Sequence, residues 1–237
     1  MSSRFDFGDR VVLVTGASGS LGTATVRQFH DAGATVCMSA RNPPEDSEAA
    51  DLLASDRVHF YQGDFTEEPA VEQVFDSLID DHGHLDALCT LVGTWEGGNP
   101  IDETDVDAFD FLIDVNLKTT FLASKYAIPH LRESGGTLVS VSSRSSLEGG
   151  EGDGPYRAAK AGVRLLTETI AEENLGTVRA NAIVPDVIDT LANREMVPDA
   201  DPSAWPTPDE IARVVLFLCS DTASVTSGAA VPVYGEM

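Results

Sequence analysis

A tyrosine and a lysine stand four residues apart in the segment YRAAK, at Tyr156 and Lys160. On a helix this spacing places both side chains on one face. A free phenol has a pKa of about 10, which suits proton transfer at neutral pH poorly, but a nearby ammonium group lowers it. The pair is therefore predicted to exchange a proton with an oxygen atom whose charge changes during a reaction.

A glycine-rich turn, TGASGSLG (15–22), follows the first apolar run of the chain and precedes a predicted helix. Glycines let the backbone turn tightly and approach a pyrophosphate, and the helix N-terminus offers free N–H groups and a positive dipole end. The alternative is an ordinary glycine-rich turn. The residues predicted to bind a dinucleotide here are Gly16, Ser18, Gly19, Ser20, Leu21 and Gly22.

The residues after the second apolar run, SARN (39–42), indicate which dinucleotide is bound. A carboxylate at this place would bind a free ribose 2′-hydroxyl and repel a 2′-phosphate, and none occurs. Arg41 instead offers a planar fork of donors that suits a phosphate. Arg41 and Asn42 therefore predict NADP(H) in preference to NAD(H), unless Arg41 only balances the acidic surface.

These residues must be positioned by a regular framework, because apolar runs alternate with amphipathic stretches along the chain. Strands are predicted at 10–15, 34–39, 57–62, 86–91, 136–142, 178–184 and 229–233. Helices are predicted at about 20–32, 67–81, 155–174 and 208–220, with a long amphipathic stretch at 103–132.

This alternation predicts right-handed βαβ units and a parallel sheet with helices on both faces. We therefore expect one α/β domain over 1–237, a doubly wound three-layer sandwich with a Rossmann-type parallel sheet of about seven strands. Its ligands should bind at the C-terminal ends of the strands. Segment 186–207 shows no regular pattern, so a substrate-binding loop or lid is predicted there.

From residue 8 to about residue 233 the chain resembles the short-chain dehydrogenase/reductase family, of the compact single-domain type. The resemblance rests on TGASGSLG (15–22), Asp64 after the third strand, DVNL (114–117), VSVSS (139–143), YRAAK (156–160) and RANAIVP (179–185). The tyrosine–lysine spacing alone is a weak signal, but the whole set in this order is specific. It implies an oxidoreductase that moves a hydride between the cofactor and a carbonyl or alcohol carbon.

The resemblance also implies roles for individual residues. Tyr156 would be the general acid/base, Lys160 would tune it and hold the nicotinamide ribose, and Ser143 would donate a hydrogen bond to the substrate oxygen. Asn116 would anchor a water that links Lys160 to solvent. The other implied cofactor contacts are Asp64 and Phe65 at the adenine, Val92 and Gly93 along the dinucleotide, and Pro185, Val187, Ile188 and Thr190 at the carboxamide.

The chain departs from the family pattern at four places. Ser20 replaces the middle glycine of the turn, TLVG (90–93) replaces Asn-Asn-Ala-Gly, Asp186 replaces a glycine, and VYGE (233–236) replaces Val-Asp-Gly-Gly. None of these changes affects Asn116, Ser143, Tyr156 or Lys160.

The substrate is not indicated by any motif. Trp95 and Trp205 lie on segments expected to border the cleft, although either could pack against the body instead. Further candidates are Ser145, Glu148, Asp186 and Leu191. His82 and His84 are interpreted as a solvated turn and no metal site is predicted, because metal binding needs three or four converging ligands. The three cysteines lie in apolar runs and are interpreted as buried free thiols.

The charge of the chain excludes some partners. Aspartate and glutamate number 39 against 15 lysines and arginines, which gives a net charge of −24. Such a surface repels nucleic acid and anionic membranes. No apolar run of about 18 residues and no apolar signal core occurs, so we expect a cytoplasmic protein. Salt at about 1 M would screen the self-repulsion, so a salt-loaded cytoplasm, as in a halophile, is predicted; the alternative is a merely acidic protein.

Two other functions stay open at this point. The chain could be a catalytically silent, dinucleotide-binding regulatory protein of the same fold, or it could reduce an activated C=C or C=N bond. The family resemblance further implies a homodimer or homotetramer, in which stretches 103–132 and 155–174 pair with their copies.

Overall fold

The computed structural model of the protein describes residues 5–45 and 47–235. Seven parallel strands form one sheet in the order β3-β2-β1-β4-β5-β6-β7. Their bounds are β1 Val11–Thr15, β2 Thr35–Ala40, β3 Val58–Gln62, β4 Ala87–Thr90, β5 Thr137–Val141, β6 Arg179–Pro185 and β7 Ala230–Val233. The prediction of a Rossmann-type parallel sheet of about seven strands is confirmed, while Glu236 of the predicted departure at the chain's end lies outside the described residues.

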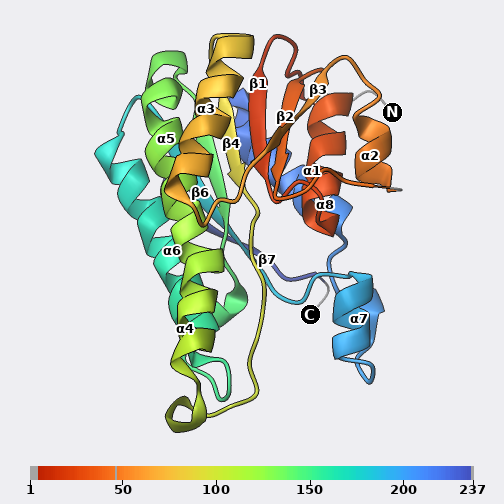
Figure 1. Ribbon diagram of the computed structural model, residues 1–237, viewed down its shortest axis with the longest axis vertical. Coiled ribbons are helices and arrows are strands. Elements are labelled where there is room, and N and C mark those ends of the chain that lie inside the picture. The colour runs from red at the N-terminus through yellow and green to blue at the C-terminus, as the bar shows by residue number, and fades with distance from the viewer. Residues whose placement is uncertain (1–4, 46, 236–237) are drawn as a thin grey trace.

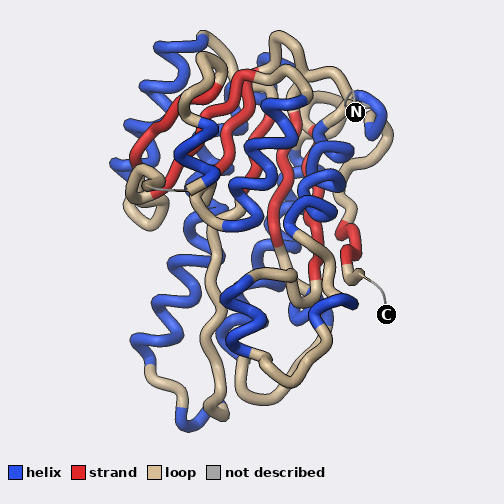
Figure 2. The backbone as a smooth tube through the Cα atoms, turned by 90° about the vertical axis from the view of Figure 1, so that its right-hand side faces the viewer, coloured by secondary structure: helices blue, strands red, loops and turns tan. Residues whose placement is uncertain are grey.

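Helices cover both faces of this sheet (Figure 1). They are α1 Ser20–Asp31, α2 Glu48–Leu52, α3 Glu68–His82, α4 Val106–Ile113, α5 Thr119–Ser134, α6 Gly154–Glu173, α7 Leu191–Met196 and α8 Pro208–Cys219. One apolar cluster joins the sheet to α1 and α8, and a second joins its other face to α3, α5 and α6. The turned view in Figure 2 shows the strands lying between these helices.

The central strand β1 shows why the chain forms this sandwich. All five of its residues are buried. Val12 and Val14 belong to the cluster with α1 and α8, whereas Val11 and Leu13 belong to the cluster with α3, α5 and α6. Side chains alternate between the two faces of a strand, so a strand covered on both sides is a continuous apolar run.

The strand order reverses direction between β1 and β4. The chain proceeds outward from β1 to β2 and β3, and then returns to β4 on the other side of β1. Thr15 at the end of β1 pairs with Ser39 on β2 and with Thr90 on β4, so these three strands end at one level. The crevice outside such a switch point is where ligands bind in open α/β sheets.

The predicted amphipathic stretch 103–132 contains a break that the pattern does not reveal. Helix α4 ends at Ile113, one π-helical turn follows over Asp114–Lys118, and α5 begins at Thr119. A π turn inserts an extra residue into the helical ladder and is often found at functional sites. Here it contains Asn116, whose side chain is fully buried.

Segment 186–207, which is predicted to be a substrate-binding loop or lid because it shows no regular pattern, contains some short regular structure. It contains α7 and the short 3-10 turn Pro202–Ala204. The hydroxyl of Thr190 caps α7 by accepting the Asn193 N–H at 3.2 Å. These helices are too short to carry a periodic pattern, and the same holds for α2.

Figure 1 shows α4 and α7 projecting beyond the end of the sheet from which the loops after β4 and β6 leave. The last described residue, Gly235, packs against the turn before α8, since a Cβ added to it would lie 2.9 Å from the Pro206 Cδ. In the described ranges, no helix combines the length and apolar character that crossing a bilayer requires. Cys37, Cys89 and Cys219 are buried free thiols, as predicted.

Candidate active site

The glycine-rich turn is shaped by close backbone contacts. Gly16 has φ +67°, and a Cβ there would lie 3.0 Å from the backbone of Leu91 and Val92. A Cβ on Gly22 would lie 2.2 Å from the Gly16 carbonyl oxygen, so only glycine lets α1 begin this close to the turn. No side chain caps the start of α1. The N–H groups of its first turn therefore remain available to an anion.

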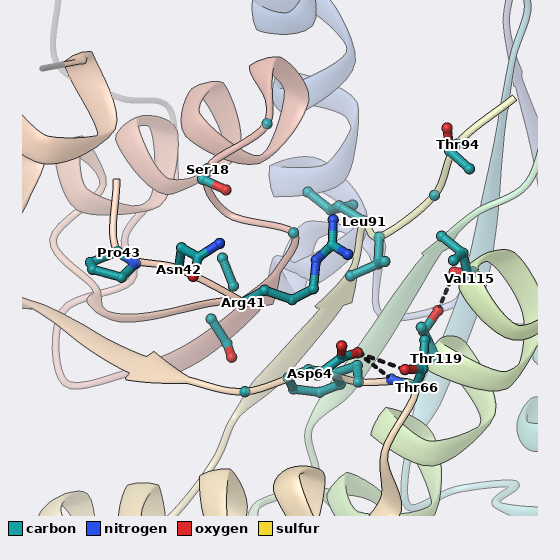
Figure 3. A pocket seen from close by; sticks show the side chains of 18 of the residues that line it. Ser18, Arg41, Asn42, Pro43, Asp64, Thr66, Leu91, Thr94, Val115 and Thr119 are labelled. Carbon is teal, nitrogen blue, oxygen red and sulfur yellow. Dashed lines mark hydrogen bonds between the residues drawn. The ribbon is translucent and has the colours of Figure 1, made fainter. Parts of the chain in front are cut away.

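A cavity of about 530 Å³ opens beside this turn at the C-terminal ends of β1 to β4 (Figure 3). Nine of the predicted cofactor residues line it: Gly16, Ser18, Gly19, Arg41, Asn42, Asp64, Phe65, Val92 and Gly93. Ser20, Leu21 and Gly22 form the first turn of α1 behind the lining. The sequence interpretation missed Ser39, Ala40, Pro43, Gly63, Thr66, Leu91, Thr94, Phe111, Val115 and Thr119. Ser39 and Leu91 end predicted strands, and Ala40 and Gly63 directly follow them, which is the signal that could have found these four.

Two charged side chains meet in the cavity. Arg41 extends between Leu91 and Asp64 (Figure 3). Within the described ranges, its guanidinium makes no salt bridge. The Asp64 carboxylate accepts hydrogen bonds from the Thr66 N–H at 2.9 Å and hydroxyl at 2.7 Å. Burial raises the pKa of Asp64, but these bonds, Arg41 and Lys118 outweigh it and lower the pKa overall, so Asp64 is an ionised acceptor.

Lys160 and Asn116 converge on Gly93. A Cβ added to Gly93 would lie 2.8 Å from the Lys160 Nζ and 2.9 Å from the Asn116 Oδ1. The Asn116 Oδ1 accepts the Thr94 N–H at 3.1 Å, which ties the π turn to the segment after β4. The Lys160 Nζ donates to the Val141 carbonyl at 3.1 Å. Burial lowers the pKa of Lys160 to about 8, because a desolvated ammonium is disfavoured.

Tyr156 lies one helical turn before Lys160 on α6, and the Lys160 Nζ is 5.9 Å from the centre of its ring. Burial raises the pKa of Tyr156, a hydrogen bond with Ser143 lowers it and the Asp153 carboxylate raises it, with a net rise. The sequence analysis predicted instead that Lys160 would lower the pKa of Tyr156. The difference arises because the phenol is desolvated, while the ammonium is turned to a backbone carbonyl and is itself easily deprotonated.

Two serines at the end of β5 support this pair. Ser143 begins the 3-10 turn Arg144–Leu147, and its hydroxyl accepts the Ser145 N–H at 3.2 Å. Ser142, which the sequence interpretation missed, donates to the Lys160 carbonyl at 2.7 Å. The structure thus brings Asn116, Ser143, Tyr156 and Lys160 together, one strand away from the cavity.

The segment predicted to hold the nicotinamide carboxamide lies farther along the sheet. Pro185 ends β6, and Val187 and Ile188 lead to Thr190 at the start of α7. None of these four residues lines the 530 Å³ cavity.

The predicted substrate residues also lie outside that cavity. Trp95 is 43 % exposed and its ring lies against Gly97, where an added Cβ would be 2.9 Å from Cζ2. Leu191 is exposed at the start of α7. Trp205 is partly buried before α8, and Ser145 and Glu148 lie on the segment after β5. Asp186 accepts a hydrogen bond from the Arg144 Nη1 at 2.7 Å.

Comparison with known proteins covers almost the entire chain. A family model described as enoyl-(acyl carrier protein) reductase matches residues 16–235. The cis-4-hydroxycyclohexanecarboxylate dehydrogenase of Sinomonas cyclohexanicum is 33% identical over 245 residues, which are 97% of this chain and 96% of that protein. The meso-2,3-butanediol dehydrogenase of Serratia marcescens is 30% identical over 250 residues, 98% of this chain and 95% of that protein.

Solved structures agree with these relatives. A short-chain type dehydrogenase/reductase from Mycobacterium ulcerans superposes with a TM-score of 0.89 at 26% identity, covering 97% of this chain and 90% of that one. The aldohexose dehydrogenase of Thermoplasma acidophilum gives a TM-score of 0.86 at 27% identity, over 96% and 93%. The similarity extends through the glycine-rich turn, the π turn and α6, so the chain belongs to the short-chain dehydrogenase/reductase family. The members of this family are oxidoreductases that use nicotinamide dinucleotides.

Proposed function

We propose that the protein moves a hydride between NADP(H) and a carbonyl or alcohol carbon of a small molecule, with Tyr156 as general acid/base. The observation that carries this proposal is the convergence of Ser143, Tyr156 and Lys160 beside a dinucleotide-sized cavity. The two dehydrogenases compared above are named for hydroxylated small molecules, which supports the same class of substrate.

The residues present fit a nicotinamide dinucleotide. The free N–H groups at the start of α1 would hold its pyrophosphate, and the ionised Asp64 with Phe65 would hold the adenine. Lys160 and segment 185–190 would hold the nicotinamide end. When bound, the dinucleotide supplies or accepts the hydride.

Arg41 supports the phosphorylated form of the cofactor. Its guanidinium extends into the cavity and forms no salt bridge with any residue that the structure describes (Figure 3). No carboxylate stands at the end of β2, and the carboxylate at the end of β3, Asp64, is occupied by Thr66. A 2′-phosphate would meet Arg41 without displacing an existing ion pair.

The side chains around the phenol suit proton transfer to the substrate oxygen. Ser143 would donate a hydrogen bond to that oxygen as negative charge develops on it. Tyr156 would then transfer its proton to that oxygen. Lys160, whose pKa is about 8, is protonated at neutral pH and would return a proton to the phenolate. Asn116 would hold a water next to Lys160 that relays protons from solvent.

The exposed surface of three helices, outside the candidate active site, supports self-association of the protein. Helices α4, α5 and α6 expose large apolar side chains, among them Phe109, Phe121 and Leu165, which are 44%, 48% and 53% exposed. Clusters of this kind commonly mark protein–protein contacts. We propose that these helices pair with their copies in a homodimer or homotetramer.

The test uses a panel of aldehydes, ketones and secondary alcohols, together with activated alkenes and imines, with nicotinamide absorbance as the readout. Wild type should turn over at least one compound, and Tyr156→Phe should lower kcat by about 100-fold or more, because the proton donor is lost. Energy transfer from Trp95 and Trp205 to NADPH should show that the variant still binds cofactor. Binding by wild type without any turnover would instead favour a silent dinucleotide-binding protein, and turnover only of C=C or C=N compounds would change the substrate class.

A further inference from the structure

The guanidinium of Arg157 packs against the backbone of segment 145–153, which lies between Ser143 and Tyr156 in the chain. Its Nη1 donates to the carbonyl oxygens of Glu148 at 3.1 Å and Ser145 at 3.4 Å. A Cβ added to Gly150 would lie 2.2 Å from the Arg157 Cζ, so the backbone packs directly against the guanidinium. One side chain therefore fixes the segment at several points.

Arg157 also forms an ion pair with a carboxylate that stands near Tyr156 in the chain. Its Nε donates to Asp153, which is buried at the start of α6, three residues before Tyr156. The ion pair is itself largely buried, with side chains 23% and 10% exposed, so solvent screens it less than a surface pair. The Asp153 charge raises the pKa of Tyr156, which means that the phenol senses this carboxylate.

The other groups around Tyr156 do not take over this role. The Lys160 Nζ lies 5.9 Å from the centre of the ring and donates a hydrogen bond to the Val141 carbonyl. Ser143, from the end of β5, is uncharged. Arg144, on the turn that packs against α6, is paired with Asp186.

We propose that Arg157 is a positioning residue for the reaction, which holds Asp153 in an ion pair, limits the effect of its charge on Tyr156 and fixes the segment between Ser143 and Tyr156. This inference rests on the proposed function of Tyr156. The same segment supports the loop after β4, because the Gly98 N–H donates to the Gly152 carbonyl at 2.7 Å. A Cβ on Gly97 would touch both the Asp153 Cβ, at 3.2 Å, and the ring of Trp95.

The decisive variant is Arg157→Met, measured as the pH dependence of kcat/KM for carbonyl reduction. Reduction requires the protonated phenol, so the rate falls as pH rises through its pKa. With Asp153 unopposed, the midpoint should move upward by about one pH unit. The double variant Asp153→Asn/Arg157→Met removes both charges and should bring the midpoint back to the wild-type value or below it.

Three further variants separate charge from structure. Arg157→Lys keeps the positive charge but loses the planar guanidinium that bonds to the segment. The midpoint of the pH profile should therefore stay unchanged, while KM for the substrate rises severalfold. Asp153→Asn leaves Arg157 unopposed and should lower the midpoint. Arg164→Met is the matched control, because Arg164 pairs with Glu168 at 2.7 Å on the same helix and its side chain is 24% exposed. That control should not move the midpoint.

A second readout does not depend on turnover. The chain has four tyrosines, so the ultraviolet absorbance of tyrosinate is titrated as a difference between each protein and the same protein carrying Tyr156→Phe. The Tyr156 titration should move upward in Arg157→Met even if no substrate is found, which separates this proposal from the proposed function. An unshifted titration in a folded Arg157→Met protein, or a double variant that stays shifted, would overturn it.

Discussion

At the scale of single residues, the proposal places Arg41 at the point where NADP(H) and NAD(H) differ. Arg41 faces the cavity without a salt bridge to any residue in 5–45 or 47–235. Its contribution to cofactor affinity should therefore depend on the charge of the cofactor that binds there. Arg41→Ala should raise KM for NADPH by about tenfold or more and leave KM for NADH almost unchanged, since only NADPH carries the 2′-phosphate. The measurement is initial-rate kinetics with both cofactors.

The control for this prediction is Arg213→Ala, an exposed arginine near Glu210 on α8. It should alter neither KM. If wild type uses NADH and NADPH equally well, or if Arg41→Ala weakens both to the same extent, the preference for NADP(H) is wrong.

Lys160 shows how a functional group destabilises the fold that holds it. Burial lowers its pKa from 10.5 to about 8, so below pH 8 the folded and unfolded chains are both charged and the folded state carries the full cost of the buried ammonium. Between pH 8 and 10.5 the folded protein loses the proton first, and this contribution to stability should rise with pH.

Lys160→Met should therefore unfold at a temperature no lower than wild type at pH 7, with the difference shrinking above pH 8. Its kcat should fall by about 100-fold or more, because the proton relay is lost. Calorimetry across pH and a turnover assay check both parts. Lys125→Met, at an exposed lysine paired with Glu68, should leave kcat unchanged; a Lys160→Met protein that melts well below wild type at pH 7 would contradict the reasoning.

At the scale of elements, sequence patterns predict what is long or buried on both faces. All seven strands were found as apolar runs because helices cover the sheet on both sides. Helices α2 and α7 were missed because five or six residues hold no helical period. The π turn was missed because the apolar pattern of 103–132 continues across it.

The candidate site shows the same division. Asn116, Ser143, Tyr156 and Lys160 stand in motifs with fixed spacing, so the sequence could bring them together as a prediction. Ser142 and Arg157 bond to backbone carbonyls of other segments, and no local pattern encodes such contacts. Thr66 bonds to Asp64, two residues away, but belongs to none of the recognised motifs. The cavity lining from α4 to α5 depends on the register of the π turn, which explains why Phe111, Val115 and Thr119 were not predicted.

At the scale of the whole molecule, the net charge of −24 and the apolar side chains of α4, α5 and α6 act in opposite directions. Copies repel one another at low salt, whereas about 1 M salt shortens the Debye length from about 10 to 3 Å. Raising KCl should therefore increase the molar mass measured by light scattering towards a dimer or tetramer. It should also raise the melting temperature by more than about 5 °C, equivalent to roughly 2 kcal/mol.

Phe121→Glu is the matched variant, because it places a charge within the apolar surface and leaves the cavity lining intact. It should stay monomeric at every salt concentration but still melt higher in KCl. If the melting temperature of the wild-type protein does not rise with KCl concentration, the prediction of a protein adapted to a salt-loaded cytoplasm is wrong.

The contact of Gly235 with the turn before α8 has a practical consequence for handling the protein. The Tyr234 ring centre lies 4.9 Å from the Arg144 Cζ, so the last described residues border the loop that follows Ser143. Figure 1 shows α7 beyond one end of the sheet and α2 near the other end. An affinity tag at the C-terminal end is therefore expected to crowd the loop that follows Ser143, and turnover by such a protein should be compared with that of a protein tagged at the N-terminal end.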